Sequence, residues 1–191
     1  MEPKTQEAPA VIPFTDIQNH WAAPYIEKLY TMGVVSGKSA TRFDPNAAVT
    51  RAEMAKIVVK IFGYTVPETV AEDPFWDVPK ESWFAPYVAA AKENAITGGY
   101  PDGSFKPGAL VDRASALKML IVAAGFAEGI PETSAFSDVQ VSDWYAGFID
   151  FAHKNDIVGG YADNTFKPGN PVTRAEVMKM AVKLYELKKG K

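Results

Sequence analysis

The segment Gly98 to Gly108, GGYPDGSFKPG, recurs as Gly159 to Gly169, GGYADNTFKPG, with eight of eleven positions identical. The same spacing extends outward from this segment to other residues along the chain. Trp21, Trp83 and Trp144 are separated by 83 − 21 = 62 and 144 − 83 = 61 residues. The same two intervals relate further residues: Phe43, Phe105 and Phe166, and Arg51, Arg113 and Arg174. A fixed period of this length indicates one structural unit repeated three times.

Two stretches that contain proline or glycine separate the three units and are typical of linkers. The sequence therefore predicts six segments: an N-terminal tail at 1–13, repeat 1 at 14–63, a linker at 64–74, repeat 2 at 75–125, a linker at 126–135 and repeat 3 at 136–187.

Each unit begins with an aromatic-x-Asp turn and a tryptophan, followed by an apolar-periodic segment that predicts a first helix. Pro24 and Pro86 fit the first turn of that helix, where a missing N–H is tolerated. Apolar residues four apart predict its buried stripe: Tyr25 and Leu29, Tyr87 and Ala91, and Phe148 and Ala152. Glycines then end the helix, and turn sequences follow.

The second helix of each unit has a clear start signal. Thr50 with Glu53, and Thr173 with Glu176, form the pattern of a capping box ahead of an apolar run. In repeat 2, Asp112 is the predicted N-cap, and Ser115 stands where the box has glutamate.

One helical pair cannot bury both of its apolar stripes alone. Three pairs should therefore pack around a shared core with approximate threefold symmetry. The sequence predicts an all-α fold of three helix-loop-helix repeats with six main helices.

Composition excludes several classes of function. The chain has 191 residues, 47% of them hydrophobic, which is enough for a buried core. Its 20 basic and 23 acidic residues give a net charge of −3, which argues against nucleic acid as a partner. Without cysteine and with only two histidines, a disulfide or ordinary zinc site is excluded, and we expect no metal or cofactor. No run of eighteen apolar residues and no signal-peptide core is present, so neither membrane insertion nor an export signal is expected in this chain.

Together, the aromatic-x-Asp opening, the tryptophan, the Gly-Tyr-x-Asp-x-x-Phe-x-Pro loop and Val-Thr-Arg-Ala-Glu resemble the S-layer homology domain, over about Pro13 to Leu187. The resemblance implies a pseudo-threefold spindle, monomeric because it closes its own core. It also implies a non-catalytic anchor at the bacterial cell surface. Such triplets attach surface proteins noncovalently to secondary cell wall polymers, often through pyruvate-ketal N-acetylmannosamine.

By resemblance, the binding sites lie in grooves between repeats and contain the arginine of the Thr-Arg-Ala-Glu motif, which is Arg51, Arg113 or Arg174. An arginine in the first helical turn is expected beside free backbone N–H groups and the positive end of the helix dipole. Its guanidinium can hold the ketal carboxylate through paired hydrogen bonds.

For the other candidate site residues, a structural role and a functional role both fit the sequence. Trp21, Trp83 and Trp144 fit a groove wall that faces a sugar ring and fit a core equally well. Tyr100 and Tyr161 are expected to hydrogen-bond sugar hydroxyls, or else to pack over their turns, and the loop glycines Gly37, Gly99 and Gly160 belong to the same candidate set. Asp16, Asp77 and Asp138 fit a role in bracing the turn better than a role as acceptors from sugar hydroxyls.

Departures from the repeat pattern predict unequal grooves. Repeat 1 has Ser36-Gly37-Lys38 in place of Gly-Gly-Tyr, and repeat 2 has Asp112-Arg113-Ala114-Ser115 in place of Thr-Arg-Ala-Glu. Since repeat 3 keeps both motifs, the groove containing Arg174 is expected to be competent, and at least one of the others weakened or specialised.

Two alternative functions remain open on sequence alone. A wall-glycan hydrolase fragment needs two facing carboxylates about 5–10 Å apart, and Asp102 and Asp163 are at hand, although their turn positions account for them. A structural protein–protein module is the other, with calcium binding disfavoured because the turns lack dense alternating acids.

Overall fold

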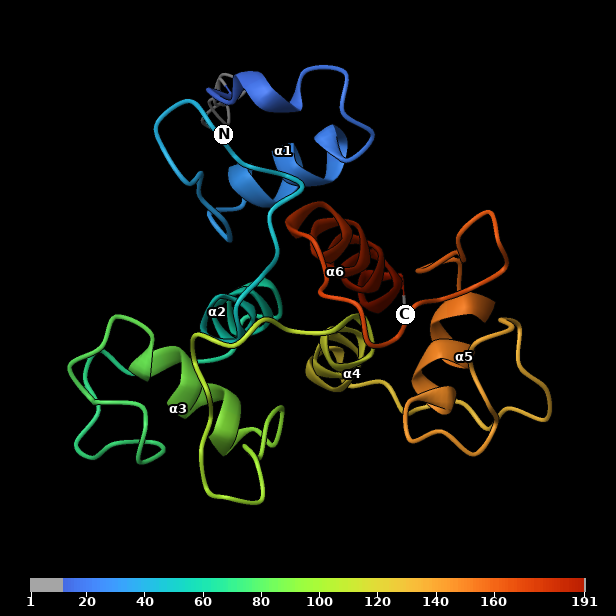
Figure 1. Ribbon diagram of the computed structural model, residues 1–191. Helices are drawn as coiled ribbons and strands as arrows, with labels where there is room; N and C mark the ends of the chain where they lie inside the picture. The colour runs from blue at the N-terminus through green and yellow to red at the C-terminus, as the bar shows by residue number, and fades with distance from the viewer. Residues whose placement is uncertain (1–11, 191) are drawn as a thin grey trace, which may run out of the picture.

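Helices supply the regular secondary structure of residues 12–190, which the computed structural model describes (Figure 1). The elements are η1 (Thr15–Ile17), α1 (Ala23–Thr31), α2 (Arg51–Ile61), α3 (Ala85–Glu93), α4 (Arg113–Ala124), α5 (Ala146–Lys154) and α6 (Arg174–Lys189). The predicted all-α fold with six main helices is confirmed. Most of the predicted tail, at 1–11, lies outside the described residues, and α6 extends two residues past the predicted end of repeat 3.

The second helices of the three repeats, α2, α4 and α6, contact one another at the centre, and α1, α3 and α5 surround them (Figure 1). The main outer contacts join α3 to α2, α5 to α4 and α1 to α6. Each first helix therefore packs on the second helix of another repeat, and α1 on α6 closes the ring between the first and last repeats.

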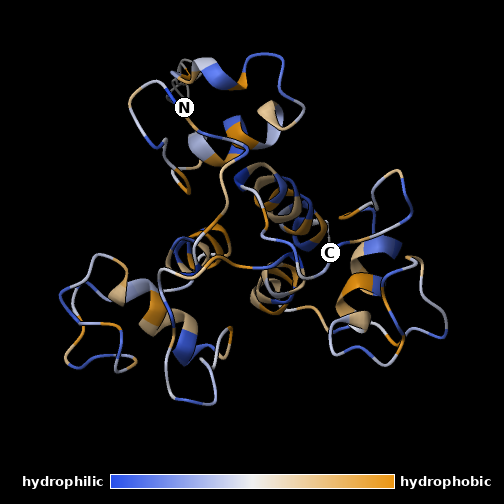
Figure 2. Cartoon of the chain, viewed as in Figure 1, coloured by the Kyte–Doolittle hydropathy of each residue, from blue (hydrophilic) through white to orange (hydrophobic). Residues whose placement is uncertain are grey.

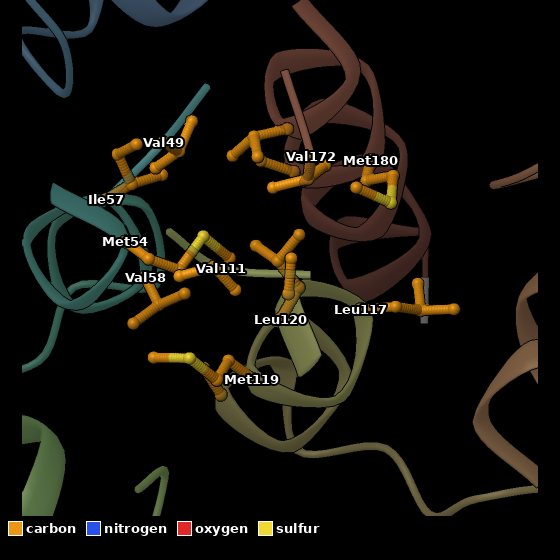
Figure 3. Close-up of a cluster of buried hydrophobic side chains, with 14 of the residues drawn as sticks. Val49, Met54, Ile57, Val58, Val111, Leu117, Met119, Leu120, Val172 and Met180 are labelled. Atoms are coloured by element: carbon orange, nitrogen blue, oxygen red, sulfur yellow. The ribbon is translucent and has the colours of Figure 1, made fainter. Parts of the chain in front are cut away.

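The threefold relation is clearest at three valines that precede the central helices. The backbone N–H of Val49 donates to the carbonyl of Val172 at 3.1 Å, Val172 donates to Val111 at 2.9 Å, and Val111 donates to Val49 at 2.9 Å. Figure 3 shows these valines in one cluster with Met54 of α2 and Leu120 of α4. The closed cycle of hydrogen bonds ties all three repeats together at one point.

Hydrophobic residues lie along both the central and the outer helices, while the peripheral loops are mostly hydrophilic (Figure 2). The predicted stripes are largely confirmed, because Leu29, Ala91, Phe148 and Ala152 are buried. Tyr25 and Tyr87 are only partly buried and pack against the core. Within the described part of the chain, no helix combines the length and apolarity that crossing a membrane requires.

The predicted caps are present at the central helices. Thr50 Oγ1 accepts from the N–H of Glu53 at 3.3 Å, while the Glu53 carboxylate accepts from the N–H of Thr50 at 3.0 Å. Thr173 and Glu176 form the same box, and Asp112 caps α4 by accepting from the N–H of Ser115 at 2.8 Å.

The expectation of free N–H groups beside the arginines is wrong. The Arg51 N–H donates to the Ala109 carbonyl at 2.9 Å, and the Ala52 N–H donates to the Pro107 carbonyl at 3.0 Å. Equivalent bonds occupy the first two N–H groups of α4 and α6. Since each bond goes to the loop of another repeat, these N–H groups hold the ring together, and anion binding has to rely on side chains.

Candidate functional site

Three grooves lie between the repeats, and each contains one of the candidate arginines. The Arg51 groove, of about 310 Å³, is lined by Arg51, the loop at 95–100, Lys118 and Trp144. The other two have equivalent linings: the Arg113 groove, of about 230 Å³, with Arg113, the loop at 157–161, Lys179 and Trp21, and the Arg174 groove, of about 220 Å³, with Arg174, the loop at 34–38, Lys56 and Trp83. Each groove takes its arginine, its loop and its tryptophan from three different repeats.

The three arginines are buried, with exposures of 8% for Arg51, 6% for Arg113 and 5% for Arg174. Each Nε donates to the carbonyl of a repeated phenylalanine: Arg51 to Phe105 at 2.7 Å, Arg113 to Phe166 at 2.9 Å and Arg174 to Phe43 at 2.9 Å. Each guanidinium also lies over that phenylalanine's ring, 4.1–4.7 Å from its centroid. The arginines are therefore not solvated helix-start residues, because each fixes a loop of the next repeat.

The terminal guanidinium nitrogens differ between the grooves. Arg113 Nη1 forms an ion pair with Glu176 Oε1 at 2.7 Å. Arg174 Nη2 donates to the Ser36 carbonyl at 2.8 Å. Among the described residues, neither Nη atom of Arg51 has a hydrogen-bond or ion-pair partner.

Burial also affects the cations of the grooves. It lowers the pKa of Arg51 and of Arg174, while acidic neighbours oppose the change. Both remain charged, because a guanidinium is not deprotonated in proteins. Burial likewise lowers the pKa of Lys56, and the nearby charge of Lys60 adds to the effect. The grooves thus hold partly desolvated positive charge, which favours an anionic ligand.

The structure places the three tryptophans at the groove walls. Their side chains are 54–56% exposed, so they are not core residues. Lys56 Nζ lies 5.5 Å from the centroid of the Trp83 ring, and Lys118 Nζ lies 5.4 Å from that of Trp144. A flat apolar face with a cation beside it suits a sugar ring that carries an acidic substituent.

The loop tyrosines lie beside the arginines. The guanidinium of Arg51 is 4.7 Å from the centroid of the Tyr100 ring, and that of Arg113 is 5.1 Å from Tyr161. The Tyr161 hydroxyl donates to Glu176 Oε1 at 3.0 Å. Burial raises the pKa of Tyr161, with Arg113 opposing and Glu176 adding to the rise. These rings both line the grooves and cover the arginines.

The three loop glycines line the grooves, and none of them has room for a side chain. A Cβ at Gly37, Gly99 or Gly160 would lie 2.5–2.6 Å from Cε1 of the first aromatic residue of its repeat. These aromatic residues are Phe14, Phe75 and Phe136. The glycines therefore allow the loop to pack closely on the aromatic-x-Asp turn.

The three candidate aspartates brace the loops. Asp16 accepts from the N–H of Phe43 at 2.9 Å and of Asp44 at 2.7 Å. Asp77 and Asp138 bind the equivalent N–H pairs of repeats 2 and 3. Burial raises the pKa of Asp16, but these hydrogen bonds and the nearby Arg42 lower it overall. None of the three lines a groove, so bracing accounts for them.

Comparison with known proteins agrees with this threefold arrangement. The family model of the S-layer homology domain matches residues 13–55, 74–117 and 135–178. The chain belongs to the S-layer homology domain family.

The relatives of this chain include S-layer proteins and enzymes such as an exoglucanase. Identity is 30% over 181 residues with the exoglucanase XynX of Acetivibrio thermocellus, covering 92% of this chain and 16% of the relative. It is 30% over 141 residues with a surface layer protein of Brevibacillus choshinensis, covering 68% and 12%. The S-layer protein sap of Bacillus anthracis is 28% identical over 174 residues, covering 89% and 21%. The chain thus spans about a fifth or less of the length of these relatives.

The exchange of residues between S-layer homology repeats overturns the basis for ranking the Arg174 groove highest. Arg174 does not meet the intact Gly-Gly-Tyr loop of its own repeat, because its groove contains Gly37 and Lys38 of repeat 1. Tyr161 instead lies with Arg113. The sequence motifs of one repeat therefore do not describe one groove.

Sequence reasoning missed the groove lysines Lys56, Lys118 and Lys179. They recur at the arginine period, 118 − 56 = 62 and 179 − 118 = 61, which is the signal that identifies them. Each groove is also lined by one carboxylate, from Glu53, Asp112 or Glu176, whereas glycoside hydrolysis needs two. Among the described residues, no cluster of three acidic or histidine side chains has the arrangement of a metal site.

Proposed function

We propose that this chain is a non-catalytic anchor that binds an anionic secondary cell wall polymer through its three inter-repeat grooves. The ligand group is a pyruvate ketal on N-acetylmannosamine, and the anchored cargo is the remainder of a surface protein. Family membership and the S-layer relatives support the cell wall anchoring role and a place at the cell surface.

The observation that carries the proposal is a buried arginine in every groove with at least one terminal nitrogen that is free of protein partners among the described residues. No described buried side-chain nitrogen lacks a hydrogen-bond partner, so these free nitrogens are open to solvent in the grooves. A carboxylate that meets them gains charge-assisted hydrogen bonds in a partly desolvated site.

The neighbouring tryptophan and lysine support a sugar as the carrier of that carboxylate. Trp144 offers an exposed ring face, and Lys118 adds a positive charge at the same wall of the Arg51 groove. A pyruvylated sugar has an apolar face and an acidic edge, which match these two side chains.

Avidity follows from the ring. Three shallow grooves on one rigid, monomeric body can engage successive units of one polymer, so overall binding is stronger than that of any groove alone. The N–H groups that join the repeats keep the grooves at fixed separations.

The test is calorimetric titration with a pyruvylated N-acetylmannosamine wall fragment, alongside the same fragment without the ketal. We expect binding that depends on the ketal. Among the described residues, Lys154 is exposed, pairs with Asp150 alone and lies outside the grooves, so a Lys154→Ala variant should bind both fragments as the unchanged protein does. Equal binding of both fragments would contradict the role of the arginines. Binding of neither would favour a protein–protein module.

A further inference from the structure

The three arginines offer different numbers of nitrogens to a ligand. Nε is already bonded to a phenylalanine carbonyl in each groove, so a carboxylate can be held by paired hydrogen bonds only through Nη1 and Nη2. Glu176 accepts from Nη1 of Arg113, and the Ser36 carbonyl accepts from Nη2 of Arg174, so each of these nitrogens already uses one of its two N–H groups. Within the described part of the chain, Arg51 alone of the three has both Nη atoms unengaged.

The difference follows from the third residue of each central helix. In α6 this residue is Glu176, which reaches across the groove to Arg113 and to the Tyr161 hydroxyl. In α2 it is Glu53, which pairs with Lys38, the residue that replaces tyrosine in repeat 1. In α4 it is Ser115, whose hydroxyl donates to Asp112 Oδ2 at 2.7 Å. The Arg51 groove therefore lacks the acidic side chain that its counterparts have at this position.

Asp112 does not replace the missing glutamate. Its Oδ1 accepts from the Ser115 N–H at 2.8 Å and its Oδ2 from the Ser115 hydroxyl, so both oxygens are directed to the helix start. The guanidinium of Arg51 instead stacks between the rings of Tyr100 and Phe105, each 4.7 Å away at the centroid. It is oriented but not neutralised by a direct ion pair.

On the basis of the proposed function, we infer that the Arg51 groove is the primary carboxylate-binding site of this chain. We infer also that, in the Arg113 groove, Glu176 competes with the ligand carboxylate for the guanidinium of Arg113. A ligand carboxylate in the Arg113 groove meets the negative charge of Glu176 at the same guanidinium and competes with it for Nη1, whereas the guanidinium of Arg51 has no ion-pair partner among the described residues. A charge-assisted hydrogen bond of this kind corresponds to about a tenfold or greater difference in Kd.

The test exchanges the two helix caps. The double variant D112T/S115E gives α4 the cap of α6 and places a glutamate opposite Arg51. The reciprocal variant T173D/E176S gives α6 the cap of α4 and removes the competitor. Each variant keeps a cap type that the protein already uses, and a cooperative unfolding transition with an unchanged circular dichroism spectrum confirms that the fold is intact.

The readout is the Nε–H signal of each arginine in a nitrogen–proton NMR titration, assigned by its loss in the matching Arg→Lys variant. Each Nε–H is held by a backbone carbonyl, so it reports its own groove. The probes are a pyruvylated N-acetylmannosamine monosaccharide and, separately, sodium pyruvate.

We expect the Arg51 signal to respond at about tenfold lower probe concentration than that of Arg113. In D112T/S115E, the Arg51 signal should no longer respond at a lower probe concentration than the Arg113 signal. In T173D/E176S, the Arg113 signal should respond at a lower concentration than it does in the unchanged protein. Equal response at all arginines, or no effect of the exchange, overturns the ranking while the anchor function stands. A response to pyruvate alone, with Arg51 first, supports the ranking but contradicts the proposed sugar. No response to either probe overturns both.

Discussion

The arginines should contribute unequally to stability, and replacement of each by methionine tests this. Arg51→Met removes the Nε bond to the Phe105 carbonyl and leaves that acceptor unsatisfied, which costs about 1–3 kcal/mol. Arg113→Met removes the equivalent bond to Phe166 and also leaves the Glu176 carboxylate without its cation. Loss of one partner of a buried ion pair costs about 3–5 kcal/mol. Since the Glu176 side chain is 21% exposed, we expect the lower end of that range, about 3 kcal/mol.

The assay measures the free energy of unfolding of both variants in urea, and then repeats the measurement with each variant combined with Glu176→Gln. Glutamine keeps the shape of the capping residue and removes the charge. The excess loss of about 3 kcal/mol in Arg113→Met over Arg51→Met should then disappear, because no uncompensated carboxylate remains. Equal losses for Arg51→Met and Arg113→Met in the wild-type background would refute the assigned role of Glu176.

Three further changes test other parts of the structure. Trp144→Ala should weaken binding of the pyruvylated fragment about 2- to 10-fold in calorimetry. Because Trp144 is 54% exposed, the free energy of unfolding should change by no more than about 0.5 kcal/mol. An unfolded variant would contradict the groove-wall placement. Gly160→Ala should destabilise the protein by about 1–3 kcal/mol, because the added Cβ would lie 2.6 Å from Phe136 Cε1. Gly159→Ala is the control and should change stability little, because no atom lies within 4 Å of its Cβ. Similar melting temperatures for the two variants would refute the close packing. Folding lowers the pKa of Asp16, so its carboxylate stabilises the protein above the unfolded pKa of about 3.9, and this contribution is lost as pH falls through the folded pKa. In Asp16→Asn, the free energy of unfolding should therefore depend less on pH below about pH 4. An unchanged pH profile would contradict this.

Sequence periodicity was enough to predict the helices and their caps. The Thr50–Glu53 and Thr173–Glu176 boxes and the Asp112 cap are local patterns, and local hydrogen bonds form them. The partners of each helix were not predictable in this way. A repeat of 61–62 residues is equally compatible with an arginine that serves its own loop and with one that serves the next repeat, since the pattern is the same in both cases.

Predicting that the arginines are buried also requires knowledge of the tertiary structure. A charged residue in the first turn of a helix is ordinarily exposed, and here the loop of another repeat covers it and accepts from its Nε. The tryptophans show the opposite, because Trp21, Trp83 and Trp144 belong to a residue type that is usually well buried and yet are half exposed. Both departures from residue-type expectation occur in the grooves, where the proposed binding of an anionic sugar would use them.

The exchange between repeats explains how three copies of one motif can carry different sites without loss of the fold. The bonds that close the ring use backbone groups, as in the cycle of Val49, Val111 and Val172, and they do not depend on the identity of most groove side chains. The third residue of each central helix is therefore free to differ, provided that it still caps the helix. Glutamate and the Asp112–Ser115 pair both satisfy that condition, but only glutamate is long enough to reach an arginine across the groove. A change that leaves the cap intact can thus alter one groove and leave the other two unchanged.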